Sequence, residues 1–443
     1  MAVDSVGCRC RLAALVSSDA NPARPVIVAS TFNRNPLPFT AEGPAMLHLH
    51  VLGTSSAKPS KRRSVSGSFL ATPDGGLLID CGEGMQERIL WHDRKLRARG
   101  SVLRTRLSKV RAILLTHGHL DHCWGVLPLL HTVGMDGRKE PLLIVGPSSR
   151  KAIEWADQNP GVAPPQDSGI SSGDLALLFS WWRAHGGKDG SFGFPIEWRL
   201  LPIEDGEVVS VASPLFDSLK LKALPTEHGV PSCAWHIETL GKPGVFDRER
   251  ADSLGLSRSV RAALAAGENV ELTSDDIDEV VGEVELVNSD VEVVEGGEVE
   301  LVSGDVESLG KLLLASEFRG PSRLGRSVMV SGDTAPNNPC FQLGAVSPPD
   351  ILVHEATFLQ SHAEKALKYG HCTAKDAAEH ARSLSARSLY LTHFSSRLET
   401  TTQSVAEASE IFTATAALED GDVISVDLDG LISHVRRGDD SDI

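Results

Sequence analysis

Short apolar runs alternate with amphipathic segments along most of this chain of 443 residues. The runs are rich in Val, Ile and Leu and end at Gly, Pro or polar residues, which is typical of buried strands. They lie at 110–115, 142–145, 223–226, 328–330 and 389–392. Helices are predicted at 87–91, 124–132 and 374–383, the last with Thr373 as its N-cap. Residues 160–194 are rich in Gly, Pro and Ser and predict a surface loop. The alternation predicts an α/β fold.

One cluster of polar residues follows the run at 110–115. His117, His119, Asp121 and His122 stand within six residues of one another. A tight turn after a strand can direct alternate side chains into one pocket, and the first turn of a following helix can add the rest. Imidazole nitrogen and carboxylate oxygen both suit zinc, and a carboxylate can bridge two ions. The alternative is a polar turn that is merely rich in histidine, but this spacing is far more specific than a lone histidine.

Three further candidate ligands each follow a different apolar run. They are His228, Asp333 and His393. Each stands where a strand gives way to a turn, and a layered α/β fold exposes such side chains at a sheet edge. Taken alone, His228 would be read as an ordinary surface or core histidine. The recurrence of a strand followed by a ligand favours a dinuclear metal site.

Several motifs carry a resemblance to a known family. They are Leu49–Thr54, Leu78–Gly84, His354–Phe358, Gly370–Thr373 and Leu391–Arg397, together with the histidine–aspartate cluster. The chain resembles metallo-β-lactamase-fold hydrolases and, among them, ribonuclease Z, the tRNA 3′-processing endonucleases. The His-Glu-Ala-Thr-Phe run is the most specific of these motifs, because the whole superfamily shares the histidine–aspartate cluster.

The resemblance implies an architecture. We expect the αββα sandwich of the superfamily in a catalytic domain at 46–435, with an insertion at 243–310. The insertion would hold a degenerate tRNA-binding arm and acidic repeats at 267–307. Residues 1–45 are expected to be an unstructured extension, with an organellar transit peptide as the alternative, and 436–443 a tail. The family also implies a homodimer.

The resemblance also implies roles for the candidate ligands. His117, His119 and His228 would hold one zinc ion, Asp121, His122 and His393 a second, and Asp333 would bridge the two. The same ligands accept manganese or iron. Asp121 would also orient or deprotonate the attacking water.

Cleavage of an RNA chain releases a 3′ oxyanion that needs a proton. The resemblance assigns His371 as the general acid, with Glu355 holding it protonated through a carboxylate–imidazole hydrogen bond. From the residues alone, His371 could simply begin a helix. Lys61 and Arg63 would meet the RNA 3′ end. Ser395 and Arg397 would clamp a phosphate, because an arginine fork suits phosphate oxygens.

A net charge of −16, taken over the whole chain, argues against an RNA substrate, because phosphate contacts need Lys and Arg. Between Glu268 and Glu307, however, there are fifteen acidic residues and no Lys or Arg, which leaves the rest of the chain near −1. This segment is an internal repeat, since 282–292 and 297–307 are identical at nine of eleven positions. Its alternating Val and Glu favour short strands in a hairpin extension. A solvated, partly disordered tract is the alternative.

Two departures from the family pattern bear on the substrate. The arm at 246–261 lacks the family's Gly-Pro element, and Ser64 stands where the family has asparagine. We therefore expect a zinc-dependent endoribonuclease that removes the 3′ trailer from tRNA precursors. The alternatives are a dinuclear phosphodiesterase for cyclic nucleotides or other small phosphodiesters, and a binding protein that has kept only the fold.

Composition adds expectations about the compartment. Seven scattered cysteines argue against a disulfide framework and for a reducing compartment. No apolar run approaches the roughly 20 residues that cross a bilayer. We therefore expect a soluble, cytoplasmic protein, with organellar targeting by 1–45 as the alternative.

Overall fold

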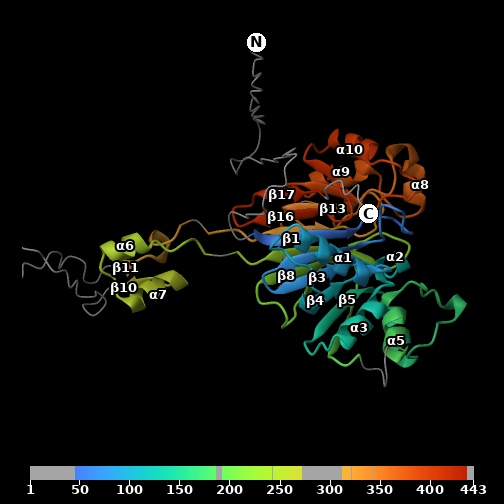
Figure 1. Ribbon diagram of the computed structural model, residues 1–443, viewed down its shortest axis with the longest axis horizontal. Coiled ribbons are helices and arrows are strands. Elements are labelled where there is room, and N and C mark those ends of the chain that lie inside the picture. Colours follow the sequence, from blue (N-terminus) through green and yellow to red (C-terminus); the bar gives the residue numbers. More distant parts are fainter. Residues whose placement is uncertain are drawn as a thin grey trace, which may run out of the picture.

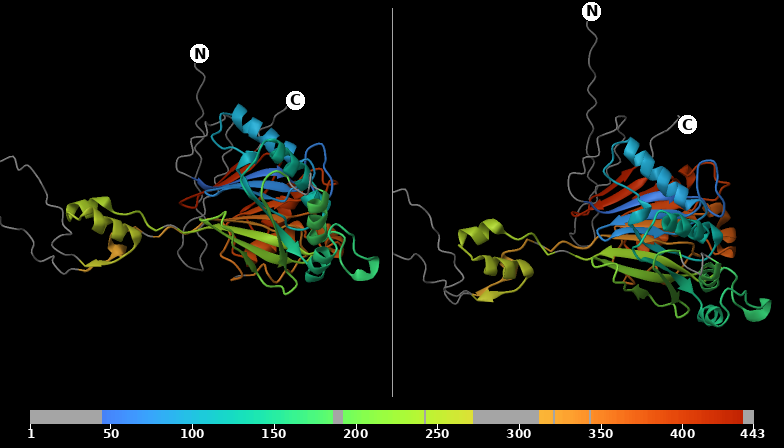
Figure 2. Two further views of the ribbon diagram at one scale, coloured as in Figure 1. Left: turned by 90° about the horizontal axis from the view of Figure 1, so that it is seen from below. Right: turned by 60° about the horizontal axis from the view of Figure 1, so that its bottom comes forward.

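Two large β-sheets packed face to face form the body of the computed structural model (Figure 1). It describes residues 45–436, apart from 186–191, 242, 272–311, 321 and 343. Helices cover the outer faces of both sheets, so the layers run helix, sheet, sheet, helix (Figures 1 and 2). The sandwich predicted from the sequence is confirmed.

The first sheet has eight strands among the described residues, in the order β17-β16-β1-β2-β3-β4-β5-β6. Their bounds are β1 Ala45–Gly53, β2 Gly67–Thr72, β3 Gly75–Ile79, β4 Val110–Leu114, β5 Leu142–Ser148, β6 Ile196–Pro202, β16 Val423–Asp427 and β17 Ile432–Val435. Strands β3 to β6 are parallel to one another, as expected for strands joined through helices.

The second sheet has seven strands in the described part of the chain, in the order β15-β14-β13-β12-β9-β8-β7. Their bounds are β7 Val209–Val211, β8 Leu219–Thr226, β9 Ser232–Thr239, β12 Ser327–Val330, β13 Ile351–Glu355, β14 Leu389–Thr392 and β15 Thr415–Ala417. Strands β12 to β15 are parallel, so their carboxyl ends lie at one edge of the sheet.

Helices pack against both outer faces. Those of the body are α1 Met85–Ala98, α2 Leu120–Cys123, α3 Val126–Met135, α4 Arg150–Gln158, α5 Leu175–His185, α8 Ala363–Lys368, α9 Ala374–Ser383 and α10 Thr402–Ser409. Side chains of α1, α3 and α5 share a buried cluster with the first sheet, and those of α9 and α10 share one with the second. A third buried cluster, which includes Trp235, fills the space between the sheets.

The helices test three of the local predictions. Helix α9 has the predicted bounds, and Thr373 and Asp376 form a capping box at its start. The predicted helix 124–132 is wrong at its start, because the chain turns at Gly125, whose Cβ would lie 2.1 Å from the carbonyl oxygen of Gly82. The predicted loop 160–194 is wrong too. It contains α5, whose apolar side chains pack into the core at one face.

A small unit stands apart from the body, joined to it by two segments that run side by side (Figures 1 and 2). It consists of α6 Arg248–Ser253, α7 Arg258–Ala266 and the paired strands β10 Val270–Glu271 and β11 Leu312–Leu313. Leu256, Leu264 and Phe318 belong to its own buried cluster. We call this unit the arm. The predicted hairpin of acidic repeats and the extension 1–45 lie outside the described residues, apart from Gly267–Glu271 at the start of the repeats and Ala45, the first residue of β1.

The carboxyl ends of β4 in one sheet and β12 in the other meet where the candidate ligands were predicted. Two hydrogen bonds join the sheets there. The Cys233 amide donates to the Thr116 carbonyl at 2.9 Å, and the Trp235 indole donates to the Leu115 carbonyl at 3.0 Å. The chain after β4 is therefore fixed to the second sheet before it reaches the first histidine.

Candidate metal centre

The turn after β4 presents the histidine–aspartate cluster as a rigid unit. His119 is the N-cap of α2, so His117 lies before the helix while Asp121 and His122 lie in its first turn. Between the two leading histidines, Gly118 packs against the chain that enters α5. A Cβ on Gly118 would lie 2.0 Å from the Gly173 carbonyl oxygen, so only glycine fits there.

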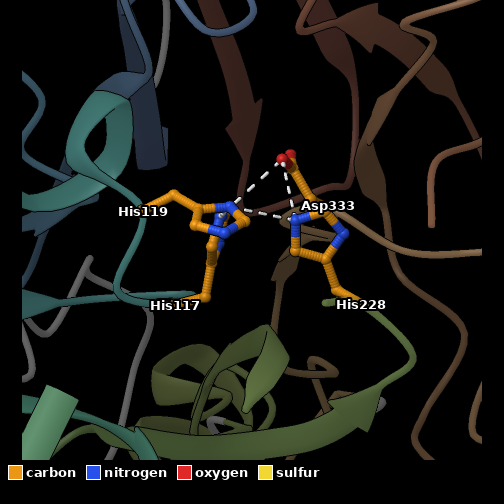
Figure 3. Close-up of side chains that lie close together, drawn as sticks. All are labelled: His117, His119, His228 and Asp333. Carbon is orange, nitrogen blue, oxygen red and sulfur yellow. Dashed lines mark hydrogen bonds and ion pairs between the residues drawn. The ribbon is translucent and has the colours of Figure 1, made fainter. Parts of the chain in front are cut away.

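A first group of donors gathers His117, His119, His228 and Asp333, whose ligand atoms all lie within 4.8 Å of one another (Figure 3). His119 Nδ1 lies 3.1 Å from both His117 Nε2 and His228 Nε2. Asp333 Oδ2 lies 3.7 Å from the same two nitrogens. His228 comes from the loop after β8, and Asp333 from the loop after β12. Three imidazoles and one carboxylate are a donor set that suits zinc.

A second group gathers Asp121, His122 and His393, again within 4.8 Å. His122 Nε2 lies 3.1 Å from His393 Nε2, and Asp121 Oδ2 lies 3.6 and 3.5 Å from these two nitrogens. The other oxygen of Asp333, Oδ1, faces this group at 3.6 Å from His122 Nε2. One carboxylate therefore contacts both groups, one oxygen to each.

Asp333 Oδ1 provides a test of whether cations fit. It is a buried oxygen without a hydrogen-bond partner. A buried carboxylate oxygen without a donor is costly unless a cation meets it. The donors that surround it are nitrogens and oxygens, the atoms that divalent transition metals prefer. The residues present therefore fit divalent metal ions.

Neighbouring side chains fix the orientation of the rings. His122 Nδ1 donates to Asp80 Oδ2 at 2.7 Å, which leaves Nε2 directed into the site. Asp80 in turn accepts from the amide and hydroxyl of Thr116 at 2.8 and 2.9 Å. His228 Nδ1 donates to the Gly370 carbonyl at 2.8 Å. Two of the candidate ligands are thus oriented through the ring nitrogen that faces away from the centre.

Two histidines of the centre are neutral near pH 7, whereas a third holds a proton. Burial lowers the pKa of His117, and burial and the neighbouring His228 lower that of His119 to about 4, so both rings are neutral near pH 7. Burial opposes a charge on His122 as well, but Asp333, Asp80 and other carboxylates outweigh it and raise its pKa to about 10. A metal ion that binds there must displace a proton.

Beside the metal centre, Glu355 and His371 form a hydrogen-bonded pair. Glu355 ends β13 and is fully buried, and its Oε1 accepts from His371 Nδ1 at 3.0 Å and from the Thr334 amide at 3.0 Å. Its Oε2 accepts from the Thr357 hydroxyl at 2.6 Å. Burial opposes the charged form of His371, yet Glu355 outweighs it and raises the pKa of His371 to about 9. His371 is also 3.8 Å from Asp333, so the pair lies next to the centre.

The candidate substrate contacts differ in exposure. Lys61 and Arg397 are exposed, and Ser395 is partly buried. Arg63 turns inward, donates to Thr54 Oγ1 at 2.7 Å and the Leu418 carbonyl at 3.0 Å, and lies over the Phe394 ring. Arg63 therefore holds its own loop in place, and its predicted contact with RNA stays a prediction.

Several residues of the centre were missed by sequence reasoning. The Ala57 amide donates to Asp121 Oδ2 at 2.7 Å, although the two residues are far apart in the chain. Thr357 lies 3.0 Å from His393 Nδ1 and so connects a candidate metal ligand to Glu355. A backbone donor leaves no signal in a sequence. Thr357 and Asp80, in contrast, stand in the motifs that carry the family resemblance and could have been assigned from them.

Backbone strain concentrates at the same place. Ala57, Asp80 and His393 have φ values of 58°, 58° and 55°, in the left-handed region that favours glycine. Such conformations cost on the order of 1 kcal/mol or more each and persist where surrounding contacts impose them. All three residues hydrogen-bond to a candidate ligand or are one, which indicates that the strain belongs to the centre.

Comparison with known proteins places the chain in a family. The family model described as the metallo-beta-lactamase superfamily matches residues 61–201. A protein of Pseudomonas putida named ribonuclease Z is 30% identical over 357 residues, which cover 80% of this chain and 86% of that protein. Ribonuclease Z of Natronomonas pharaonis is 30% identical over 383 residues, 86% of this chain and 98% of that one.

Among solved structures, the short form of human tRNase Z aligns with a TM-score of 0.47 and 19% identity, covering 85% of this chain and 98% of that one. No helix in the described ranges is long and apolar enough to cross a membrane.

The extent and identity of the ribonuclease Z matches, together with the superfamily match, show that this chain belongs to the ribonuclease Z family and is a metal-dependent phosphodiester hydrolase.

Proposed function

We propose that this protein is a zinc-dependent endoribonuclease that removes the 3′ trailer from tRNA precursors, with two zinc ions in each subunit. The observation that supports it best is the pair of donor groups that share Asp333, with the Glu355–His371 pair beside them. Water must attack and a poor leaving group must depart when RNA is hydrolysed. The donor groups would hold the cations that activate the water, and the Glu355–His371 pair would supply the proton to the leaving group.

His117, His119 and His228 would hold one cation, Asp121, His122 and His393 the other, and Asp333 both. When bound, two such cations lower the pKa of water and stabilise the charge on a phosphoryl group. The protein supplies the geometry. Its histidines come from strand ends, and Asp80 and the Gly370 carbonyl orient two of them.

In this proposal, Asp121 orients the attacking water and accepts its proton. The Ala57 amide holds Oδ2 of this carboxylate, while His122 and His393 lie near the same oxygen. Burial opposes the charged form, but the neighbouring His122 and a hydrogen bond with His393 outweigh it and lower the pKa of Asp121. Asp121 is therefore a carboxylate at neutral pH and can act as an acceptor.

In this proposal, His371 donates a proton to the leaving 3′ oxygen. In the protonated ring, Nδ1 donates to Glu355 and Nε2 carries the second proton. Transfer of that proton to the oxygen breaks the bond to phosphorus without release of a free 3′ oxyanion, and it leaves a 5′ phosphate on the trailer. Glu355 keeps the ring charged until the transfer takes place.

Contacts with the rest of the RNA stay proposals. Lys61, Ser395 and Arg397 are the candidates at the site. On the arm, Arg248 and Arg258 are exposed in the first turns of α6 and α7, whereas Arg250 pairs with Glu317. A homodimer, as in the family, would bring the arm of one subunit toward the site of the other, and sedimentation of the purified chain would test it.

The test is cleavage of a tRNA precursor that carries a 3′ trailer. Purified protein would be incubated with zinc or manganese, and the new 3′ end mapped by sequencing. Asp121→Ala is the inactive variant. Asp205→Ala is the matched control, because this carboxylate is 63% exposed and pairs with Arg150 on the surface.

A single cut near the discriminator base, lost in Asp121→Ala and kept in Asp205→Ala, is the expected result. If neither metal gives a cut while bis-p-nitrophenyl phosphate is hydrolysed, the tRNA assignment is wrong and the small-phosphodiester alternative replaces it. If neither substrate is hydrolysed, the proposed chemistry itself fails.

A further inference from the structure

Two exposed tryptophans stack on each other close to the metal centre. Trp124 is 44% exposed and Trp181 is 39% exposed, and their ring centroids lie 6.5 Å apart at an interplanar angle of 17°. His185 continues the stack on Trp181, with centroids 5.0 Å apart at 22°. We call Trp124, Trp181 and His185 the aromatic stack. Its two tryptophans expose part of their surface to solvent.

The aromatic stack adjoins the centre through both of its helices. Trp124 is the C-cap of α2 and follows Asp121 by three residues, a spacing that places both on one side of a helix. The chain that enters α5 passes Gly173, where a Cβ would lie 3.6 Å from a ring carbon of His119. Figure 1 shows α2 and α5 at the end of the body away from the arm.

Trp181 does not belong to the buried cluster that holds α5 against the first sheet. Its neighbour Trp182 is fully buried and fixes α5 in the core with Phe179. Trp181 points the other way. Leu120, four residues before Trp124, is 56% exposed and adds apolar surface on the same side of α2. Large apolar side chains gathered on a surface beside a catalytic centre mark a binding site.

We propose that the aromatic stack binds the base of an unpaired nucleotide, the first nucleotide of the 3′ trailer. The inference rests on the proposed function. Proteins bind single-stranded RNA by stacking bases on aromatic side chains, and every base has a suitable face. The aromatic stack therefore tolerates any trailer sequence.

The chemistry of the site indicates which nucleotide binds. In an in-line displacement, the attacking and leaving oxygens lie on opposite sides of the phosphorus. The leaving 3′ oxygen belongs to the mature tRNA and lies toward His371. The phosphate stays with the trailer, whose first nucleotide is free to turn toward α2, where Asp121 and Trp124 lie.

The experiment is a cycle that combines a protein variant with a modified RNA. Two precursors would be cleaved under single-turnover conditions, one with a normal first trailer nucleotide and one in which that nucleotide is abasic. Each precursor would be tested with wild-type protein and with Trp181→Ala. Trp181→Phe keeps a stacking face. Met135→Ala is the control, because Met135 is 82% exposed and lies at the end of α3. Hydrolysis of bis-p-nitrophenyl phosphate would be measured for each protein.

The expected loss for Trp181→Ala on the normal precursor is about 5- to 100-fold in apparent affinity, the range for one stacked base. Trp181→Phe and Met135→Ala should stay within a few-fold of wild type. On the abasic precursor, Trp181→Ala should cause no further loss. Hydrolysis of bis-p-nitrophenyl phosphate should not change.

Two results overturn the inference while the proposed function stands. One is an equal loss from Trp181→Ala on both precursors, because the tryptophan would then not contact that base. The other is a parallel loss on bis-p-nitrophenyl phosphate, which would make it a support of the metal centre. If wild-type protein leaves the normal precursor uncut, the proposed function fails and the inference falls with it.

Discussion

The Glu355–His371 pair should matter for RNA far more than for a substrate with a good leaving group. Loss of a general acid typically costs about 10²- to 10⁴-fold in rate. The 3′ oxygen of a nucleotide is a strongly basic leaving group and needs the proton, whereas p-nitrophenolate leaves readily without one. His371→Ala should therefore lose about 10²- to 10⁴-fold on a tRNA precursor and under about 10-fold on bis-p-nitrophenyl phosphate.

Glu355→Gln tests the same idea with less change in volume. An amide oxygen that faces His371 can still accept from Nδ1 and from the Thr334 amide. The amide nitrogen then faces Thr357, whose hydroxyl can accept from it and donate to the His393 carbonyl, 3.0 Å away. The Thr357 amide loses its acceptor, which lies at 3.3 Å. We expect a loss of about 1–3 kcal/mol in stability, so the variant should fold.

The Glu355→Gln variant should also respond differently to pH. Glu355 is the largest of the influences that raise the pKa of His371 to about 9, so its neutral replacement lowers that pKa. A general acid is active while protonated, and a lower pKa moves the loss of activity to lower pH. Bound cations lower both pKa values, so the predicted quantity is the difference between variant and wild type.

The assay is single-turnover cleavage between pH 5.5 and 9, with metal content measured for each protein. The alkaline limb of the rate profile should move to lower pH in Glu355→Gln. Equal losses on RNA and on bis-p-nitrophenyl phosphate, or a loss that parallels the metal content, would refute the reasoning. Either result would mean that the pair supports the metal centre instead of donating a proton.

Three further predictions concern the metal, the arm and a buried histidine. Asp333→Ala should lower the zinc content of purified protein below that of wild type by elemental analysis, and an unchanged content would remove Asp333 from the ligand set. Phe318→Ala, at a fully buried position, should destabilise the arm by about 3–5 kcal/mol and speed its proteolysis, while bis-p-nitrophenyl phosphate hydrolysis stays near the wild-type rate. Burial lowers the pKa of His92 to about 4, so its contribution to stability is complete above its unfolded value of 6.5 and is lost toward pH 4. Between pH 7 and 5 the loss is about 2 kcal/mol. Urea unfolding should show a smaller pH dependence in His92→Gln, and an equal dependence would contradict the buried neutral state.

The places of the candidate ligands could be predicted from the sequence because they depend on strand ends, whereas the sandwich was implied by the family resemblance. An apolar run of five residues such as β4 is recognisable, and the residues directly after it must emerge at the sheet edge. Helix α9 was predictable for a similar reason, since its capping box is local. Helix α5 was missed, because the Gly, Pro and Ser of its flanks obscured the apolar spacing within it.

Contacts between distant segments were beyond such reasoning. The Ala57 amide reaches Asp121 because the loops after β1 and β4 lie together, which depends on the packing of the whole sheet. The inward turn of Arg63 toward Thr54 and Phe394 is a further case, since a loop with several basic residues is typical of a phosphate contact. A pattern of basic residues in a sequence does not distinguish those that bind phosphate from those that stabilise the fold.

The same distinction explains why the aromatic stack had no signal in the sequence. Trp124 and Trp181 stand 57 positions apart, and each alone is a tryptophan next to an apolar segment. Gly118 packs against the chain that enters α5, and a Cβ there would lie 2.0 Å from the Gly173 carbonyl oxygen. The turn after β4, which carries candidate ligands, and helix α5, which carries Trp181, share this close contact. A side chain at Gly118 would displace both, so a Gly118→Ala variant should not be used to separate RNA binding from catalysis, whereas Trp181→Ala can separate them.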